Sequence, residues 1–279
     1  MNSSYTLKSW LPQIVEIAVE AGQAIMEIYA QPDLGTTYKE DNSPLTRADM
    51  VSHHIIVDKL RSLDPRLPVL SEESKSRPYQ ERETWSAFWL VDPIDGTKEF
   101  VKRNGEFTVN IALIAEGKPE LGVVHAPALG ITYWAAEGVG AFKQVAGVEA
   151  APIHIHDHHA EETLKIVASR SHAGIETEAF LDQLSKNGRH FEVLSIGSSL
   201  KLCLVAEGAA HLYPRFGPTM EWDTAAAQCV VEQAGGQVVS MQGTRLRYNK
   251  AELLNPYFMV CGSSTLPWLD HIQQATRQQ

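Results

Sequence analysis

The stretch FWLVDPIDGTKEF, residues 88–100, joins a run of apolar residues to two aspartates. The run FWLV predicts a strand too apolar to lie at the surface, and Pro93 ends its hydrogen-bond ladder. Asp92 and Asp95 stand at the exit of this strand, where a carboxylate is costly to bury unless it is paired or bound to metal. Gly96 permits close backbone approach or an unusual dihedral angle, and a helix can begin directly after it. This combination predicts a binding site at the end of a buried strand.

Composition and charge limit the classes of protein to which the 279-residue chain can belong. Its length predicts about two domains, and its 44% hydrophobic and 21% charged residues are typical of a globular protein. The formal net charge of −10 argues against binding to a nucleic acid polymer or an acidic membrane. The first residues lack the pattern of a signal peptide, and no apolar stretch approaches the ~18 residues that cross a bilayer. We expect a cytoplasmic protein with no transmembrane segment, with loose attachment to the inner membrane face left open, and we expect a monomer.

The first half of the chain is predicted to pack helices on a largely antiparallel sheet. Apolar residues close to the helical period predict one helix over residues 10–30, and a second helix is predicted over 48–63. From residue 86 onward, apolar alternation and the turn signals EGKP and APALG predict consecutive hairpins.

The second half alternates strand and helix as an α/β layer does. Strands are predicted at LKIVAS, HFEVLSIG and FMVCGS, and Gly235 and Gly236 are predicted to end the helix TAAAQCVVEQAGG. We place the domain boundary near residue 155. The N-terminal domain, 1–155, then carries most of the acidic candidates, and the C-terminal domain, 156–279, carries Asp223.

Two groups of side chains that bind metals in other proteins are interpreted differently here. Cys203, Cys229 and Cys261 are odd in number, widely spaced and set in apolar surroundings, which is typical of reduced core thiols in a cytosolic protein. The histidine-rich stretch 154–159 could bind a metal, but we favour a solvated linker or an edge strand.

Three further acidic segments have both a structural and a functional interpretation. Thr46 and Asp49 have capping-box spacing, so Asp49 could serve only to satisfy amides at a helix start. Glu72 and Glu73 follow a short apolar run and could mark a solvated strand exit. Asp223 stands directly before a predicted helix and could be a plain N-cap.

Together with Asp92 and Asp95, these carboxylates favour a metal-dependent chemistry. Carboxylates at strand ends and helix starts form an oxygen-rich cage, and Mg²⁺ takes oxygen ligands in near-octahedral geometry. Two such ions about 4 Å apart can hold the attacking and leaving oxygens of an in-line phosphoryl displacement. The amides of Gly96 and Thr97, at a helix start, would hold the phosphate.

The motifs resemble those of a known family, in order and across nearly the whole chain. DPIDGT, with SEES upstream and WDTAAAQCVVEQAGG downstream, resembles the Mg²⁺-dependent, lithium-sensitive phosphatases of the inositol monophosphatase superfamily. Within it, DNSPLTRAD, SRSH, SIGSSLKLCLVAEG and LYPRFGPTMEWDTAA look like the bacterial CysQ-type 3'(2'),5'-bisphosphate nucleotidases, which convert 3'-phosphoadenosine 5'-phosphate to AMP and phosphate. The resemblance implies an α+β or α/β fold, a layered α-β-α-β-α sandwich. Its N-terminal sheet is mostly antiparallel, its C-terminal sheet is smaller and mixed, and the site lies between the domains.

The resemblance also implies a role for each motif position, with two or three Mg²⁺ ions in the site. The implied metal ligands are Glu72, Asp92, the carbonyl of Ile94, Asp95 and Asp223. The implied catalytic residues are Asp49 and Thr97, which orient and deprotonate the attacking water, with Glu72 assisting. The substrate is expected to meet Glu72, Ile94, Asp95, Gly96, Thr97 and Asp223 with its 3'-phosphate, and His172, Ser198, Lys201 and Arg215 with the rest of the nucleotide. Lysine and arginine side chains suit its second phosphate.

Three alternatives differ from this interpretation in a testable way. A haloacid-dehalogenase-type phosphatase needs its second aspartate two positions after the first, whereas Asp95 follows Asp92 by three. The same fold could act on inositol monophosphate or fructose 1,6-bisphosphate, which a comparison of phosphate release would reveal. A catalytically silent nucleotide or metal sensor is disfavoured because every position that water activation requires is filled.

Overall fold

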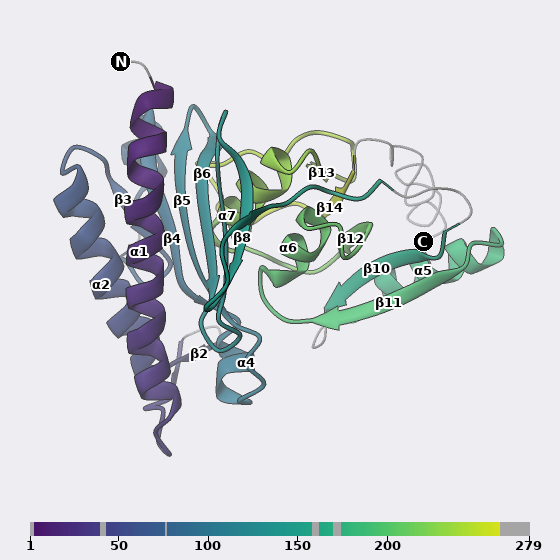
Figure 1. Ribbon diagram of the computed structural model, residues 1–279, viewed down its shortest axis with the longest axis horizontal. Helices are drawn as coiled ribbons and strands as arrows, with labels where there is room; N and C mark the ends of the chain where they lie inside the picture. Colours follow the sequence, from purple (N-terminus) through teal and green to yellow (C-terminus); the bar gives the residue numbers. More distant parts are fainter. Residues whose placement is uncertain (1–2, 40–42, 76, 158–161, 170–173, 263–279) are drawn as a thin grey trace.

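We describe the protein from a computed structural model, in which the described residues are 3–39, 43–75, 77–157, 162–169 and 174–262. Among these residues a first sheet has seven strands, in this spatial order: β3 Val69–Ser71, β4 Ala87–Asp95, β5 Thr108–Ala115, β6 Lys118–Ala126, β7 Ile131–Ala136, β8 Gly140–Val145 and β9 Ala151–Pro152 (Figure 1). β3 and β4 are parallel, and every other neighbouring pair in this sheet is antiparallel. The predicted hairpins and the largely antiparallel first sheet are confirmed.

β4 places its side chains alternately in two hydrophobic cores. Phe88 and Leu90 pack in the core toward the second half of the chain, whereas Trp89 and Val91 pack in the core on the other face of the sheet. Asp92 continues the face of Phe88 and Leu90 and is only 1% exposed. The strand therefore carries this carboxylate into the interior of the molecule.

Helices α1, Ser3–Tyr29, and α2, Arg47–Leu63, pack side by side on the outer face of this sheet (Figure 1). Both predicted helices are confirmed, but α1 begins well before the predicted start. Leu7 and Leu11 are buried and extend its apolar face toward the N-terminus, which offsets the cost of Pro12 inside the helix.

Helices α6, Leu200–Ala206, and α7, Glu221–Gln233, form the layer between the two sheets (Figure 1). α7 packs on the first sheet through small buried residues such as Ala226 and Cys229. Gly122 of β6 faces this helix, and a Cβ atom there would lie 2.2 Å from the carbonyl oxygen of Ala226. The helix thus lies on the sheet at a distance that only glycine allows.

The second sheet has five strands within the described residues and is mixed, as predicted. In spatial order they are β11 Phe191–Ile196, β10 Leu164–Ser169, β12 Leu212–Arg215, β14 Phe258–Cys261 and β13 Gln237–Ser240. β10 is parallel to β11 and β12, whereas β14 is antiparallel to β12 and β13. α5, Ile175–Lys186, covers the outer face through Phe180 and Leu184. These layers form the predicted α-β-α-β-α sandwich.

The remaining short elements are β1 Thr37–Tyr38, β2 Pro44–Leu45, α3 Tyr79–Arg82 and α4 Thr97–Val101. Along the chain, β9 is the last strand of the first sheet and β10 is the first strand of the second. However, α7 comes from the second half and packs on the first sheet. The division into domains 1–155 and 156–279 stays a prediction.

The three cysteines lie buried in the hydrophobic cores, as predicted for core thiols. Burial raises the pKa of the Cys203 and Cys229 thiols well above the usual range, which keeps both protonated. Over the described ranges, no helix combines the length and the apolar content that crossing a bilayer would require.

Candidate active site

A cleft of about 490 Å³ opens at the end of β4, next to α4, the turn before α6 and the start of α7. The predicted site residues that line it are Glu72, Asp92, Ile94, Asp95, Gly96, Thr97, Ser198, Lys201, Arg215 and Asp223. Asp49 contacts the lining residue Thr97. His172 lies outside the described residues. Segments that are far apart in the sequence therefore meet at one cleft.

Three carboxylates from two parts of the chain meet in this cleft. Asp92, Asp95 and Asp223 each offer an oxygen, and these oxygens all lie within 4.8 Å of one another. Burial raises the pKa of Asp92 well above its usual range, and the charges of Glu72, Asp95 and Asp223 raise it further. Burial likewise raises the pKa of Asp223, with added contributions from Asp95 and Glu72. A cation among these carboxylates would keep them ionised, and their oxygen donors fit a hard divalent cation such as Mg²⁺.

An irregularity in β4 explains how Asp92 and Asp95 reach the same cleft. Side chains alternate along a regular strand, so residues three apart would point to opposite faces. The register between β4 and β5 shifts between Asp92 and Asp95, and such a shift turns both carboxylates to one side. The amide of Ile94 donates to Oδ1 of Asp92 at 3.0 Å, and the Ser52 hydroxyl donates to the Pro93 carbonyl at 2.9 Å. Helix α2, which carries Ser52, therefore helps to hold the irregular segment.

Asp49 caps the start of α2 with one oxygen and contacts Thr97 with the other. Its Oδ2 accepts hydrogen bonds from the Thr46 amide at 2.7 Å and the Thr46 hydroxyl at 2.6 Å, which completes a capping box at the start of α2. Its Oδ1 accepts a hydrogen bond from the Thr97 hydroxyl at 3.3 Å. Burial raises the pKa of Asp49 to about 6, against the effect of the hydrogen bonds from Thr46. A carboxylate with this pKa suits a general base near neutral pH.

Two glycines let the segments around the cleft approach each other. Gly96 has a φ of +92°, in the left-handed region, and a Cβ atom there would lie 3.2 Å from the carbonyl oxygen of Glu106. A Cβ atom on Gly197, in the turn before α6, would lie 2.7 Å from the same oxygen. Ser198 follows with a φ of +49°, which is uncommon for a serine. The turn that lines the cleft is thus tightly constrained.

Lys201 and Arg215 bring positive charge to the cleft. Lys201 is 7% exposed, and burial lowers its pKa to about 8 although the charge of Asp95 opposes this change. The guanidinium of Arg215 donates to the carbonyls of Gly217 at 3.2 Å and Pro218 at 3.0 Å. Backbone contacts therefore orient the arginine without the help of a ligand.

Lys39 is a residue of this region that sequence reasoning missed. Its ammonium group lies 2.7 Å from Oε1 of Glu72 and 2.6 Å from Oε1 of Glu73. Burial lowers the pKa of Lys39, but the two glutamates together raise it above its ordinary value. The lysine stands in a hydrophilic stretch, YKEDN, where no pattern separates a structural cation from a solvated one.

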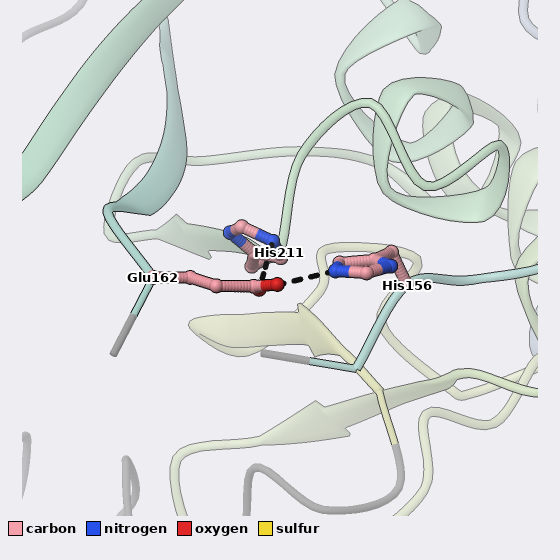
Figure 2. Close-up of side chains that lie close together, drawn as sticks. All are labelled: His156, Glu162 and His211. Atoms are coloured by element: carbon pink, nitrogen blue, oxygen red, sulfur yellow. Dashed lines mark hydrogen bonds and ion pairs between the residues drawn. The ribbon is translucent and has the colours of Figure 1, made fainter. Parts of the chain in front are cut away.

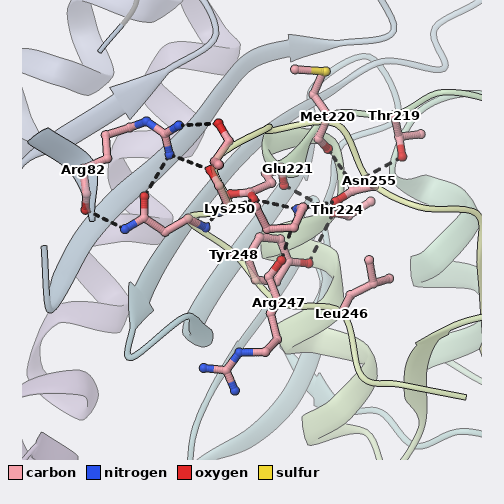
Figure 3. Close-up of polar contacts among 12 residues, drawn as sticks. Arg82, Thr219, Met220, Glu221, Thr224, Leu246, Arg247, Tyr248, Lys250 and Asn255 are labelled. Carbon is pink, nitrogen blue, oxygen red and sulfur yellow. Dashed lines mark hydrogen bonds and ion pairs between the residues drawn. The ribbon is translucent and has the colours of Figure 1, made fainter. Parts of the chain in front are cut away.

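A buried polar network surrounds the start of α7, the helix that carries Asp223 (Figure 3). The helix begins at Glu221, so Asp223 lies in its first turn and its interpretation as the N-cap is wrong. Instead, Oδ2 of Asp223 accepts a hydrogen bond from the Met220 amide at 2.9 Å. Glu221 is 0% exposed and accepts hydrogen bonds from the amides of Asn249 and Lys250 at 2.7 and 2.9 Å. The Lys250 ammonium also donates to Glu221 at 2.6 Å, so the helix start is anchored from outside.

Arg82 connects this network to the first half of the chain (Figure 3). Its side chain is buried and donates to Oδ1 of Asn249 at 2.9 Å and to the carbonyl of Lys250 at 3.0 Å. The Asn249 side chain donates in return to the Arg82 carbonyl at 2.7 Å. Arg82 therefore holds the loop whose amides bind Glu221.

A second cluster of possible metal ligands lies outside the residues that line the cleft (Figure 2). Nε2 of His156 lies 3.1 Å from Oε2 of Glu162, and Nε2 of His211 lies 3.9 Å from the same oxygen. However, Nδ1 of His211 accepts a hydrogen bond from the Lys165 amide at 2.9 Å. The neutral ring therefore carries its proton on Nε2, which leaves no lone pair there for a metal.

The histidine-rich stretch is only partly described. Residues 154–157 form neither helix nor strand, which agrees with a linker. His158 and His159 lie outside the described residues.

Comparison with known families identifies the chain. The family model described as the inositol monophosphatase family matches residues 6–267. The chain belongs to the inositol monophosphatase family. The predicted superfamily is confirmed.

Several relatives in the inositol monophosphatase family are similar over most of their length. The 3'(2'),5'-bisphosphate nucleotidase CysQ of Escherichia coli O157:H7 is 53% identical over 253 residues, which cover 90% of this chain and 98% of the relative. The protein of the same name from Haemophilus influenzae is 36% identical over 259 residues, covering 92% and 94%. The crystal structure of CysQ from Bacteroides thetaiotaomicron has a TM-score of 0.81 at 44% identity, covering 91% of this chain and 97% of that chain. This likeness confirms the sandwich fold.

Proposed function

We propose that the chain is a Mg²⁺-dependent phosphomonoesterase that hydrolyses the 3'-phosphate of 3'-phosphoadenosine 5'-phosphate to AMP and phosphate. The observation that carries this proposal is that one cleft holds both a carboxylate cluster, Asp92, Asp95 and Asp223, and two cations, Lys201 and Arg215. A bisphosphate needs both, because the phosphate that lies away from the metal also requires positive charge. The similarity to CysQ nucleotidases, at 52% and 53% identity over 90% of the chain, supports this substrate.

The residues of the cleft fit Mg²⁺, and we propose that they hold two or three ions. The proposed ligands are Glu72, Asp92, Asp95, Asp223 and the carbonyl of Ile94, all of which line the cleft. Carboxylate and carbonyl oxygens are the donors that this ion prefers. A cation would also relieve the repulsion that raises the pKa of Asp92 and Asp223. When bound, Mg²⁺ supplies positive charge that polarises the phosphoryl group and acidifies the attacking water.

Asp49 and Thr97 orient and deprotonate the attacking water in this proposal. The Thr97 hydroxyl can direct its proton to Oδ1 of Asp49, 3.3 Å away. The hydroxyl oxygen of Thr97 is then able to accept a proton from the attacking water. Thr46 binds the other oxygen of Asp49 and so fixes the orientation of the carboxylate. Glu72 is the third proposed catalytic residue, and the contact with Lys39 holds its side chain.

The two phosphates of the substrate are assigned to different groups in the cleft. The amides of Gly96 and Thr97 receive the 3'-phosphate, and Lys201 and Arg215 bind the 5'-phosphate. An anion next to Lys201 would raise the pKa of the lysine above its lowered value of about 8 and keep it charged. Ser198 lines the same cleft, and His172, outside the described residues, completes the proposed nucleotide contacts.

The test is phosphate release from 3'-phosphoadenosine 5'-phosphate with Mg²⁺, compared with release from inositol 1-phosphate and fructose 1,6-bisphosphate. We expect AMP as the product, the highest kcat/KM with the nucleotide, and inhibition by added Li⁺. The Asp92→Asn variant is the negative control and should release no phosphate above background. A preference for either sugar phosphate, or release without a divalent ion, would overturn the proposal.

A further inference from the structure

The Ser199 hydroxyl connects the two parts of the chain that supply the carboxylate cluster. Ser199 lies in the turn before α6, and its Oγ is 2.6 Å from Oδ2 of Asp95 and 2.6 Å from the main-chain carbonyl oxygen of Asp223. The side-chain amide of Asn110, on β5, donates to the same Oγ at 2.8 Å. Ser199 and Asn110 are each 1% exposed, so bulk water does not compete for these contacts. One hydroxyl thus contacts β4, β5 and α7.

Asn110 occupies a position that stability alone does not explain. It stands opposite Asp92 in the ladder between β4 and β5, and the next residues on its face of β5, Ala112 and Ile114, are apolar. Its Nδ2 donates to Ser199, whereas its Oδ1 has no hydrogen-bond partner among the described residues. A buried amide with one unpaired oxygen is less favourable than an apolar side chain of similar size. The contact with Ser199 is therefore the feature that accounts for the amide.

We propose that Ser199 and Asn110 are positioning residues of the carboxylate cluster. The hydrogen bond from Asn110 occupies one lone pair of the Ser199 oxygen, so the hydroxyl proton points toward the acceptors on its other side. A carboxylate is a stronger acceptor than a neutral carbonyl, so the Ser199 hydroxyl donates its proton to Asp95 and orients that carboxylate. The main-chain carbonyl of Asp223 lies 2.6 Å from the same Ser199 oxygen. The chain of contacts fixes the separation between the end of β4 and the first turn of α7. It thereby sets the spacing of Asp95 and Asp223.

This inference rests on the proposed function in one respect, because it takes the carboxylate cluster as the metal site. The test therefore measures Mn²⁺ binding to the full-length protein without substrate, from the electron paramagnetic resonance signal of the free ion. Ser199→Ala should raise the dissociation constant on the order of 10- to 100-fold, the usual cost of losing a group that orients metal ligands. Ser199→Thr keeps the hydroxyl and should keep most of the affinity.

Ser240→Ala is the matched control. Ser240 is 7% exposed, and its hydroxyl accepts hydrogen bonds from the amides of Gln242 and Thr244 at 3.2 and 3.3 Å, in the second sheet. Its loss should leave Mn²⁺ affinity unchanged. Wild-type affinity in Ser199→Ala, or an equal loss in Ser199→Ala and Ser240→Ala, would overturn the proposal.

Asn110→Ala provides an independent variant if Ser199→Ala does not fold. It should weaken Mn²⁺ binding in the same direction, and the Asn110→Ala, Ser199→Ala double variant should bind no more weakly than Ser199→Ala alone, because residues that act as a chain are not additive. Fully additive losses of Mn²⁺ affinity in the double variant would show that Asn110 does not act through Ser199. An inactive wild-type protein in the nucleotide assay, with Mn²⁺ binding still lost in Ser199→Ala, would refute the substrate and leave this inference standing.

Discussion

The α-carbon of Gly122 in β6 faces the carbonyl oxygen of Ala226 in α7 so closely that a Cβ atom on Gly122 would lie 2.2 Å from that oxygen. The same Cβ atom would lie 2.9 Å from Cβ of Cys229. Neither neighbour is the end of a flexible side chain, so neither can move away alone. Because α7 carries Asp223 in its first turn, this contact sets where that carboxylate lies relative to Asp92.

We expect Gly122→Ala to lower the free energy of unfolding by about 3 kcal/mol or more, because overpacking against backbone forces the helix outward. Phosphate release should fall as well, since Asp223 moves with the helix. Urea unfolding and the nucleotide assay measure the two effects. Gly174→Ala is the control, because its Cβ atom would meet only the side-chain end of Glu176, at 3.1 Å, and it should cost less than about 1 kcal/mol. Equal destabilisation by the two variants would contradict the packing argument.

Thr97→Val removes the hydroxyl that contacts Asp49 and keeps the shape of the side chain. We expect kcat to fall by about 10²- to 10⁴-fold, the range for loss of general acid–base assistance, with KM little changed. Thr97→Ser retains the hydroxyl and should retain most of the activity. Steady-state kinetics with 3'-phosphoadenosine 5'-phosphate measures both variants, and undiminished release by Thr97→Val would show that the assigned base is wrong.

Lys201→Met removes a buried charge from the proposed 5'-phosphate site. We expect kcat/KM for 3'-phosphoadenosine 5'-phosphate to fall about 100-fold, or about 2.7 kcal/mol of transition-state stabilisation. With 3'-AMP, which lacks the 5'-phosphate, the same variant should differ little from the wild type. A similar loss with both substrates would place Lys201 at the reacting phosphate instead.

Glu221→Gln weakens the anchor at the start of α7, because the neutral amide is a poorer acceptor for the Asn249 and Lys250 amides and the Lys250 ammonium. We expect the free energy of unfolding to fall by about 2 kcal/mol, measured by urea unfolding. Lys250→Met keeps both amide contacts to Glu221 and loses the ammonium contacts to Glu221, the Arg247 carbonyl and Asn255. The lysine side chain is 30% exposed, so the cost of this variant should be smaller. The reverse order of the two costs would contradict this account.

His125 should make the protein sensitive to mild acid. Burial lowers its pKa to about 4 from an ordinary value of 6.5, and a hydrogen bond with the Ile131 backbone opposes this only in part. Because the unfolded chain takes up the proton first, this residue leaves the free energy of unfolding unchanged above pH 6.5 and lowers it as the pH falls from 6.5 toward 4. The full loss is about 3 kcal/mol.

The His125→Gln variant isolates this effect from the carboxylates. Urea unfolding of the wild type and the variant, near neutral pH and again near pH 4, gives the measurement. The difference between the two proteins should shift in favour of the variant in acid. A constant difference across this range would show that folding does not lower the pKa of His125.

Local patterns in the sequence were sufficient to predict most helices and strands, whereas the order of the layers was implied by the family resemblance. Alternation and turn signals identified the hairpins of the first sheet, and helical periodicity identified α1 and α2. The carboxylates of the cleft could also be predicted, because Asp92 and Asp95 end an apolar strand, where a carboxylate is costly to bury unless it is paired or bound to metal.

Features that depend on contacts between distant segments could not be predicted in this way. No local pattern distinguishes Lys39, Ser199 and Asn110 from other polar residues, because their contacts are made with side chains that only the fold brings near them. The register shift that turns Asp95 toward the cleft is a property of the pairing between β4 and β5. The start of α7 was misplaced by three residues, because a helix start depends on which amides find external acceptors, and the amide of Glu221 donates to the Leu253 carbonyl at 2.9 Å.

The carboxylate cluster also bears on the stability of the fold. Asp95 belongs to β4 and Asp223 to α7, so an ion bound between them would act as a noncovalent crosslink between two layers of the sandwich. An ion at about 100 times its dissociation constant adds about 2.7 kcal/mol to the free energy of unfolding, and a chelator removes it. Removal of the ion would then lower the stability of the fold together with the proposed activity, because the ligands of the cluster come from two layers.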